Sequence, residues 1–149
     1  MKKKIVITGG EGRFAQILKK NNKKLNILYP NKKELNILNI NSINKFLKKN
    51  KPKYLIHAAA LSRPMNIHDK QISKSIDLNI IGTANIVKVC SQLKIKLIYF
   101  STGYVYEGRV GNYKETDPVL PVNNYAWSKL GGECAVTMYK NSLILRITM

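Results

Sequence analysis

The sequence predicts an α/β fold, a parallel sheet doubly wound with helices on both faces. Short apolar runs with the length of buried strands alternate with longer segments in which apolar residues recur at helical spacing. The first of these runs leads directly into a glycine-rich turn and a helical segment. Because 149 residues are enough for one hydrophobic core, we expect a single domain over residues 1–149 with right-handed crossovers between its strands.

The first predicted strand covers residues 4–8, and a helix over residues 14–20 follows it. Between them, Gly9 lets the backbone turn sharply and Gly12 lets it approach a pyrophosphate. Ala15 is small enough for the helix to pack close to the strand. The turn therefore indicates a dinucleotide site at the N-terminus of the helix.

Two charged side chains belong to the same turn. We expect Arg13 to reach the pyrophosphate and Glu11 to point to solvent, because a carboxylate beside phosphates is unfavourable. An ordinary glycine-rich turn between a strand and a helix is the alternative interpretation, since Gly-x-x-Gly-x-x-Ala by itself is a weak signal.

The second predicted strand covers residues 25–29. In this architecture the residue after it touches the adenosine ribose, where an acid favours a free 2′-hydroxyl and a base favours a 2′-phosphate. Lys32 and Lys33 precede the first acid, Glu34. This order favours NADP as the cofactor. NAD is the alternative, because lysines are common throughout the chain and these two also fit a solvated turn.

A helix is predicted over residues 41–49, with Ser42 as its N-cap and Pro52 beyond its end. A long helix is predicted over residues 69–93. Asn79 lies inside it. We expect this amide to face the sheet, to hold a water and a backbone carbonyl, and so to complete a proton relay to solvent.

The strand between these helices covers residues 54–60. It ends in three small residues, Ala58, Ala59 and Ala60, which let the backbone lie against a nucleotide. For His57 we expect a structural, hydrogen-bonded role rather than a catalytic one, because no patterned metal partner accompanies it. The last predicted strand covers residues 142–148.

The residues with the most chemistry follow a strand predicted over residues 96–100. Ser101 and Thr102 lie at its carboxyl end, where open α/β sheets bind ligands. In a helical segment, Tyr125 and Lys129 are i,i+4 neighbours on one face. A hydroxyl, a phenol and an ammonium brought together suit proton delivery to a carbonyl.

We expect Lys129 to make the Tyr125 proton easier to lose. Moving the pKa of a phenol about three units towards neutrality needs roughly 4 kcal/mol of preference for the phenolate. A close ammonium in a partly dry site supplies an energy of that order.

The formal net charge is +18. Such a charge attracts polyanions, but the lysines are spread among asparagines and isoleucines and arginine is scarce, which favours a compositional bias. No apolar run has the length of a membrane span. Cys90 and Cys134 lack metal-ligand spacing and fit free thiols. We expect a soluble cytoplasmic protein with no metal site, no nucleic-acid partner and no membrane association.

Together the motifs resemble those of the extended short-chain dehydrogenases/reductases, and they are most similar to the dTDP-4-dehydrorhamnose reductase family. Five segments in chain order carry the resemblance: Thr8-Gly-Gly-Glu-Gly-Arg-Phe-Ala15, His57-Ala-Ala-Ala60, Asn79-Ile-Ile-Gly-Thr83, Ser101-Thr-Gly-Tyr-Val-Tyr-Glu-Gly108 and Tyr125-Ala-Trp-Ser-Lys-Leu-Gly-Gly-Glu133. The resemblance implies a Rossmann-like NAD(P)-binding fold. It also implies reduction of the 4-keto group of a nucleotide-linked deoxysugar, a step of dTDP-rhamnose biosynthesis.

The resemblance also assigns roles to residues. Thr102 would hold the keto oxygen, Tyr125 would be the general acid, and Lys129 would lower the pKa of that phenol and bind the nicotinamide ribose. Asn79 matches the helix asparagine of the family and joins the catalytic set. The residues implied to contact the cofactor are Gly9, Gly12, Arg13, Phe14, Ala15, Lys32, Asn36, Ile37, Ala58, Ala59, Ala60, Tyr125 and Lys129.

Two positions depart from the family pattern. Asn36 stands where an aspartate usually lies beside the adenine, and Gly103 stands where an aspartate usually follows the threonine. The related 4,6-dehydratases carry an acidic pair directly after the hydroxyl residue. Gly103 and Tyr104 follow here, which disfavours dehydration and leaves a sugar-nucleotide 4-epimerase open as an alternative.

Family members continue into a smaller C-terminal region that supplies most sugar-nucleotide contacts. The resemblance thus implies that this region is missing, and we expect the 149 residues to fold marginally, bind cofactor weakly and turn over little substrate alone. The expected partner is a nucleotide sugar, with a homodimer left open. A non-catalytic NADP-binding regulatory subunit is the alternative from another class, because relatives serve in a methionine adenosyltransferase complex.

Overall fold

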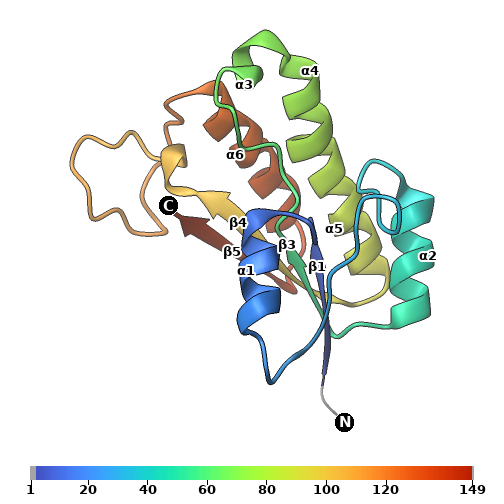
Figure 1. Ribbon diagram of the computed structural model, residues 1–149. Helices are drawn as coiled ribbons and strands as arrows, with labels where there is room; N and C mark the ends of the chain where they lie inside the picture. The colour runs from blue at the N-terminus through green and yellow to red at the C-terminus, as the bar shows by residue number, and fades with distance from the viewer. Residues whose placement is uncertain (1–2, 149) are drawn as a thin grey trace.

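The computed structural model describes residues 3–148, so residues 1, 2 and 149 of the expected domain lie outside the described part. Five strands form one parallel sheet: β1 (Lys4–Thr8), β2 (Asn26–Leu28), β3 (Tyr54–His57), β4 (Lys96–Thr102) and β5 (Ser142–Ile147). The helical elements are α1 (Arg13–Asn21), α2 (Ile40–Asn50), α3 (Ile67–Lys70), α4 (Ile72–Ser75), a π-helical turn (Ile76–Ile81), α5 (Gly82–Gln92), a 3₁₀ turn (Gly103–Val105) and α6 (Asn124–Thr137). The predicted fold class is confirmed (Figure 1).

The strand order is β2-β1-β3-β4-β5. From β1 the chain first builds outward to β2 and then returns to place β3 on the other side of β1. This reversal makes the carboxyl ends of β1 and β3 a topological switch point, the place where open parallel sheets bind ligands.

Neighbouring residues of β4 show how the sheet is covered. Tyr99 and Phe100 are consecutive and therefore point to opposite faces. The ring of Phe100 meets that of Phe14 in α1 with centroids 4.8 Å apart, whereas the Tyr99 hydroxyl donates to the Lys129 carbonyl in α6 at 3.2 Å. Helix α1 thus packs on one face and α6 on the other, with α5 beside α6 (Figure 1).

The hydrophobic core lies between the sheet and the layer of α2, α5 and α6. Its members come from strand residues that point to this face and from the apolar stripes of the helices. They include Val6, Leu55, Leu97, Ile43, Leu47, Ile86, Val89 and Val136. None of the helices within residues 3–148 is long and apolar enough to cross a membrane.

The predicted N-cap of the second helix is wrong by three residues. Asn39 caps α2, because its side-chain oxygen accepts from the Ser42 backbone N–H at 3.0 Å. The Ser42 hydroxyl instead accepts from the Asn36 backbone N–H at 3.1 Å. Both side chains are good cap formers, and the tertiary path of the preceding loop decides between them.

The strand predicted over residues 54–60 ends at His57. The Ala59 backbone N–H bonds to the Thr8 hydroxyl at 3.1 Å instead of continuing the ladder. The helix predicted over residues 69–93 is interrupted at Gln71, whose φ of −136° is not helical, and then passes through the π-helical turn before α5 begins. The spacing of apolar residues does not reveal such breaks in a helix.

Candidate active site

The turn after β1 has the backbone geometry that its glycines predicted. Gly9 has φ of +72°, and a Cβ there would meet the Ala59 Cα at 3.0 Å. The Gly12 N–H donates to the Gly9 carbonyl at 2.8 Å. Gly10 escaped the sequence interpretation although a Cβ there would meet the Tyr29 carbonyl oxygen at 2.5 Å. Its only signal in the sequence is that it directly follows Gly9 in the glycine-rich turn.

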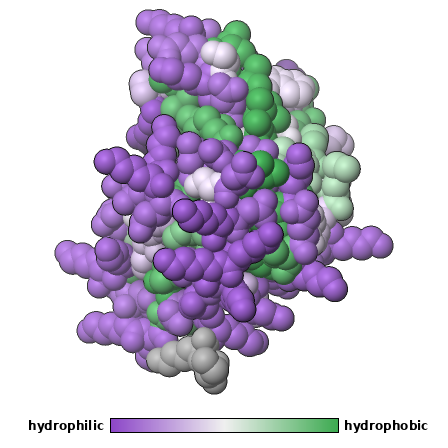
Figure 2. All heavy atoms as spheres, turned by 90° about the vertical axis from the view of Figure 1, so that its right-hand side faces the viewer, coloured by the Kyte–Doolittle hydropathy of each residue, from purple (hydrophilic) through white to green (hydrophobic). Residues whose placement is uncertain are grey.

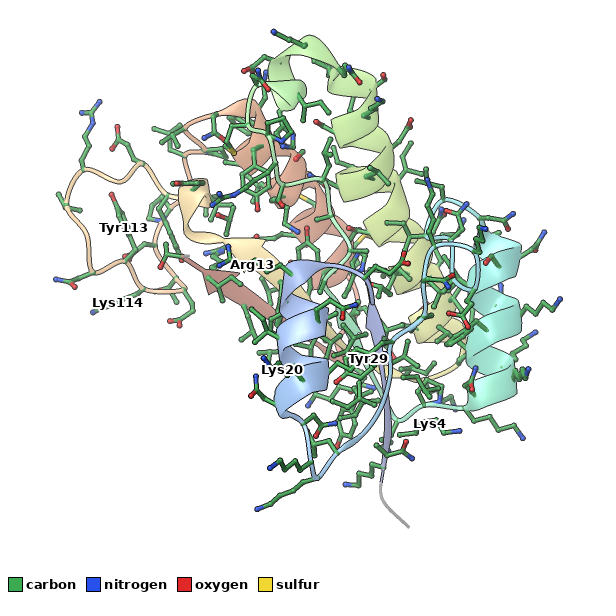
Figure 3. All side chains as sticks on the ribbon, in the orientation of Figure 1. Lys4, Arg13, Lys20, Tyr29, Tyr113 and Lys114 are labelled. Carbon is green, nitrogen blue, oxygen red and sulfur yellow. The ribbon has the colours of Figure 1, made fainter. Side chains whose placement is uncertain are left out.

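Helix α1 begins with free backbone donors. Gly12 is its N-cap and offers no side-chain hydrogen bond, and the first turn holds no acidic residue. Ala15 is buried against the sheet, as predicted. The uncapped N–H groups and the positive end of the helix dipole suit an anion. Arg13 projects from this first turn (Figure 3), and Glu11 is exposed, as expected.

A pocket of about 260 Å³ opens beside this turn. Its lining combines the glycine turn, the loop after β2 and the residues after β3, so the three segments meet at the switch point. Seven of the predicted cofactor residues line it: Gly9, Gly12, Lys32, Asn36, Ile37, Ala59 and Ala60. Gly10, Glu11, Asn31, Leu35 and Leu78 complete the wall. The other six predicted cofactor residues do not line this pocket: Arg13, Phe14, Ala15, Ala58, Tyr125 and Lys129.

Thr102 and Tyr125 meet at the carboxyl end of β4. Thr102 is the last residue of the strand and only 6% exposed, and Tyr125 lies in the first turn of α6, which Asn123 caps through the Ala126 N–H at 2.8 Å. Burial raises the pKa of Tyr125, and the nearby Thr102 hydroxyl partly offsets this. The phenol is therefore protonated at neutral pH.

Lys129 lies in α6 one turn after Tyr125, as predicted, and its side chain is buried. Its ammonium nitrogen lies 4.2 Å from the centroid of the Tyr99 ring. Burial lowers the pKa of Lys129 to about 7, against an opposing effect of Glu133. Burial is the largest influence on the pKa of both Tyr125 and Lys129. The expectation that Lys129 lowers the pKa of Tyr125 stays a prediction.

Asn79 is fully buried in the π-helical turn. Its side-chain oxygen accepts from the Leu61 N–H at 2.8 Å, and its amide nitrogen donates to the Leu61 carbonyl at 2.9 Å and to the Ser128 hydroxyl at 2.8 Å. The expected backbone-carbonyl contact is thus present. Asn79 joins the loop after β3 to α6, and π-helical turns often occur at functional sites.

Two histidines flank the cluster. His57 is buried between the hydroxyls of Thr8 at 2.7 Å and Thr83 at 3.1 Å, which confirms a hydrogen-bonded position. Burial, with the nearby charge of Lys129, lowers the pKa of His57 to about 3. His68 was not anticipated. It is buried, and its ring lies 5.1 Å from that of Tyr125.

The structure thus brings the predicted residues together in two neighbouring places. The glycine turn, Lys32 and the alanines surround the pocket, whereas Thr102, Tyr125, Lys129 and Asn79 gather between β4 and α6. Within residues 3–148 no group of three or more His, Cys, Asp or Glu side chains has a metal-binding arrangement. Cys90 and Cys134 are free thiols.

A parallel sheet with a glycine turn at its switch point, beside a threonine, a tyrosine and a lysine, defines an α/β protein with a Rossmann-like fold. The chain belongs to the family described as the RmlD substrate binding domain, which matches residues 2–149. The resemblance inferred from the motifs is confirmed at this level.

Relatives and solved structures agree with the family. The dTDP-4-dehydrorhamnose reductase of Aggregatibacter actinomycetemcomitans is 29% identical over 148 residues, or 96% of this chain and 50% of the relative. Methionine adenosyltransferase 2 subunit beta of Pongo abelii is 27% identical over 143 residues, or 90% of this chain and 42% of the relative. The crystal structure of dTDP-4-dehydrorhamnose reductase from Bacillus anthracis in complex with NADP has a TM-score of 0.89 at 29% identity, covering 98% of this chain and 53% of that chain. The chain spans about half the length of these proteins.

Proposed function

We propose that the protein containing this chain is an NADPH-dependent reductase of the short-chain dehydrogenase/reductase type. Its substrate would be the 4-keto group of a nucleotide-linked deoxysugar. The observation that carries this proposal is the meeting of Thr102 and Tyr125 at the carboxyl end of β4, next to a pocket lined by the glycine turn. The similarity to dTDP-4-dehydrorhamnose reductases supports the substrate class.

The residues present fit a dinucleotide. Close approach of Gly9 to Ala59 leaves no room for a side chain at the turn, and the uncapped start of α1 offers N–H donors for a diphosphate. Lys32 lines the pocket, whereas Glu34 does not and instead accepts from the Asn31 N–H at 2.9 Å. This arrangement favours NADP over NAD. When bound, NADPH would supply the hydride.

The side chains would handle the proton. The Thr102 hydroxyl would donate to the keto oxygen while the Tyr125 phenol, kept protonated by its raised pKa, transfers its proton to that oxygen. Lys129 would stabilise the resulting phenolate from the same face of α6. Asn79 would hold the loop after β3 and Ser128 in place around this cluster.

Replacing Tyr125 with Phe in the longest natural form of the protein tests the proposal. Reduction should fall by roughly 10²–10⁴-fold, while NADPH binding, followed by fluorescence, stays unchanged. Tyr104→Phe is the matched control: its phenol is half exposed and its ring lies beside that of Tyr125. Unchanged turnover in the Tyr125 variant would refute the assigned proton donor, and absence of NADPH binding would refute the cofactor.

A second candidate rests on the similarity to methionine adenosyltransferase 2 subunit beta. In that reading the pocket would bind NADP in a regulatory subunit without turnover. Reduction of a nucleotide-linked 4-keto-sugar would exclude it, whereas tight NADPH binding without reduction of any such substrate would favour it.

A further inference from the structure

A second and larger groove lies beside the nucleotide pocket. Its volume is about 1300 Å³, and it runs between α2 and the end of β2 with the loop that follows. The side of the molecule that carries α2 is predominantly hydrophilic (Figure 2). Lys32 and Asn36 also line the nucleotide pocket, but the α2 residues of this groove have no role in the proposed reductase chemistry.

One face of α2 forms the first wall. The lining residues of this helix fall into two adjacent i,i+4 rows: Asn41, Lys45 and Lys49, and Ser42, Phe46 and Asn50. Ile43 and Leu47 point the other way and are completely buried. The helix therefore packs on the core through its apolar stripe, and its other face presents lysines, amides and a partly buried phenylalanine ring to the groove.

The loop after β2 forms the second wall and carries Lys32 and Lys33. Four lysines thus line the groove against two glutamates, Glu11 and Glu34. None of the four lysines forms an ion pair within residues 3–148. Four cations left without partners on two facing walls favour an anionic occupant.

Three asparagines of the groove add donors rather than acceptors, whereas Asn50 already donates its amide nitrogen to the Phe46 carbonyl at 2.9 Å. The side-chain oxygen of Asn31 accepts from the Lys33 and Glu34 N–H groups, that of Asn36 from the Leu38 N–H, and that of Asn39 from the Ser42 N–H. Because these oxygens are occupied, the amide nitrogens remain as the free groups, and they can only donate. Lysine and amide donors together suit phosphate oxygens.

We propose that this groove binds a chain of phosphate groups, either a free polyphosphate or the backbone of a nucleic-acid strand. A single phosphate would reach only part of a groove that follows a helix of 11 residues, about 16 Å long. Lys45 and Lys49 lie one turn apart, so their ammonium groups can contact successive phosphates. The rings of Tyr29 and Phe46 in the lining suit stacking if the chain carries bases.

Titration calorimetry with a short linear polyphosphate and with an oligothymidylate of equal charge tests this proposal. The double variant Lys45→Gln and Lys49→Gln should weaken binding roughly tenfold and reduce the salt dependence by about two phosphate contacts. The control is Lys19→Gln with Lys20→Gln, which removes the same charge from the exposed last turn of α1 and should change affinity less than about twofold. The tighter probe identifies the source of the phosphates.

Equal loss in the control pair would overturn the proposal, because it would show attraction to the overall charge. Absence of binding by both probes at low salt, or equally tight binding of polyglutamate, would overturn it as well. The outcome is separable from that of the reductase assignment. Lys45 and Lys49 do not line the 260 Å³ pocket, so NADPH affinity should persist in their variant, and Tyr125→Phe should leave polyphosphate binding unchanged.

Discussion

The side-chain nitrogen of Lys129 lies 4.2 Å from the centroid of the Tyr99 ring, so a buried amino group rests on the face of a buried phenol. The nearest acid along α6, Glu133, is held by Arg146 of β5 through a bidentate contact with a shortest distance of 2.8 Å. Lys129 is therefore kept in a site that favours its neutral form, with its pKa lowered to about 7 by burial.

This relationship predicts a pH-dependent stability. The pKa of Lys129 is about 7 when folded and 10.5 when unfolded, so the unfolded chain binds more protons between these values and stability rises with pH across that window. Lys129→Met should remove this rise. Urea unfolding at pH 7 and pH 10 should show the variant more stable than the parent at pH 7, with a smaller difference at pH 10. Parallel pH profiles would contradict the burial of a titrating lysine.

His57 predicts a change of stability in the same direction at lower pH. Burial lowers its pKa from 6.5 to about 3, so the unfolded chain takes up a proton first and stability falls as the pH drops from 6.5 towards 3. Each pKa unit corresponds to about 1.4 kcal/mol. His57→Gln should be less stable at pH 7, through the altered hydrogen bonds, and should lose less stability between pH 7 and pH 4. Equal losses in both proteins, measured by denaturant unfolding, would rule out this contribution.

Adjacent glycines of α6 should respond differently to alanine. A Cβ at Gly132 would meet the Tyr99 hydroxyl at 2.5 Å and the Asn79 carbonyl at 2.7 Å, both in fixed positions. A Cβ at Gly131 would meet only side-chain atoms of Ile80, which can move. Gly132→Ala should therefore destabilise by about 1–3 kcal/mol. Gly131→Ala should be near neutral, because helix propensity gains about 1 kcal/mol. Thermal unfolding checks the pair, and equal effects would show that the close contacts are relieved by movement of the helix.

Two ion pairs provide a further comparison. Arg146→Met leaves the Glu133 carboxylate, 4% exposed, without its partner and should cost about 3–5 kcal/mol. Arg109→Met breaks the exposed pair with Glu107 and should cost less than about 1 kcal/mol.

Chemical denaturation of both arginine variants measures the difference. Arg146 also donates to the Tyr106 hydroxyl. The ring of Tyr106 stacks on that of Tyr113 with centroids 4.7 Å apart. Tyr113 and Lys114 lie in the loop that extends from the sheet (Figure 3). Arg146→Met should therefore also speed proteolysis of this loop, and cleavage at the parent's rate would contradict its anchoring role.

The local sequence predicted the structure correctly where a residue type suits only one kind of local conformation or packing. The apolar runs became strands, Gly9 adopted the left-handed backbone that its place in the turn requires, and Ala15 packed against the sheet. The spacing of Tyr125 and Lys129 placed both in α6. These features depend on contacts within a few residues, which is why patterns reveal them.

Two kinds of feature could be known only from the tertiary structure. One is the choice between residues that are equally suited to a local role, and the other is contact between residues far apart in the chain. Ser42 and Asn39 are both competent caps, and only the loop path selects Asn39. His68 reaches Tyr125 from 57 positions earlier in the chain without any motif. Burial raises the pKa of Tyr125, and burial is a property of the assembled layers that no local pattern predicts.

The sequence by itself determined the parallel α/β fold, the glycine turn and the residue types of the site, because these follow from backbone freedom and side-chain period. The tertiary structure alone decided how dry each ionisable group is and which lysines share a groove. Dehydration and clustering arise when segments distant in the chain pack together, and no local pattern encodes the distances between them.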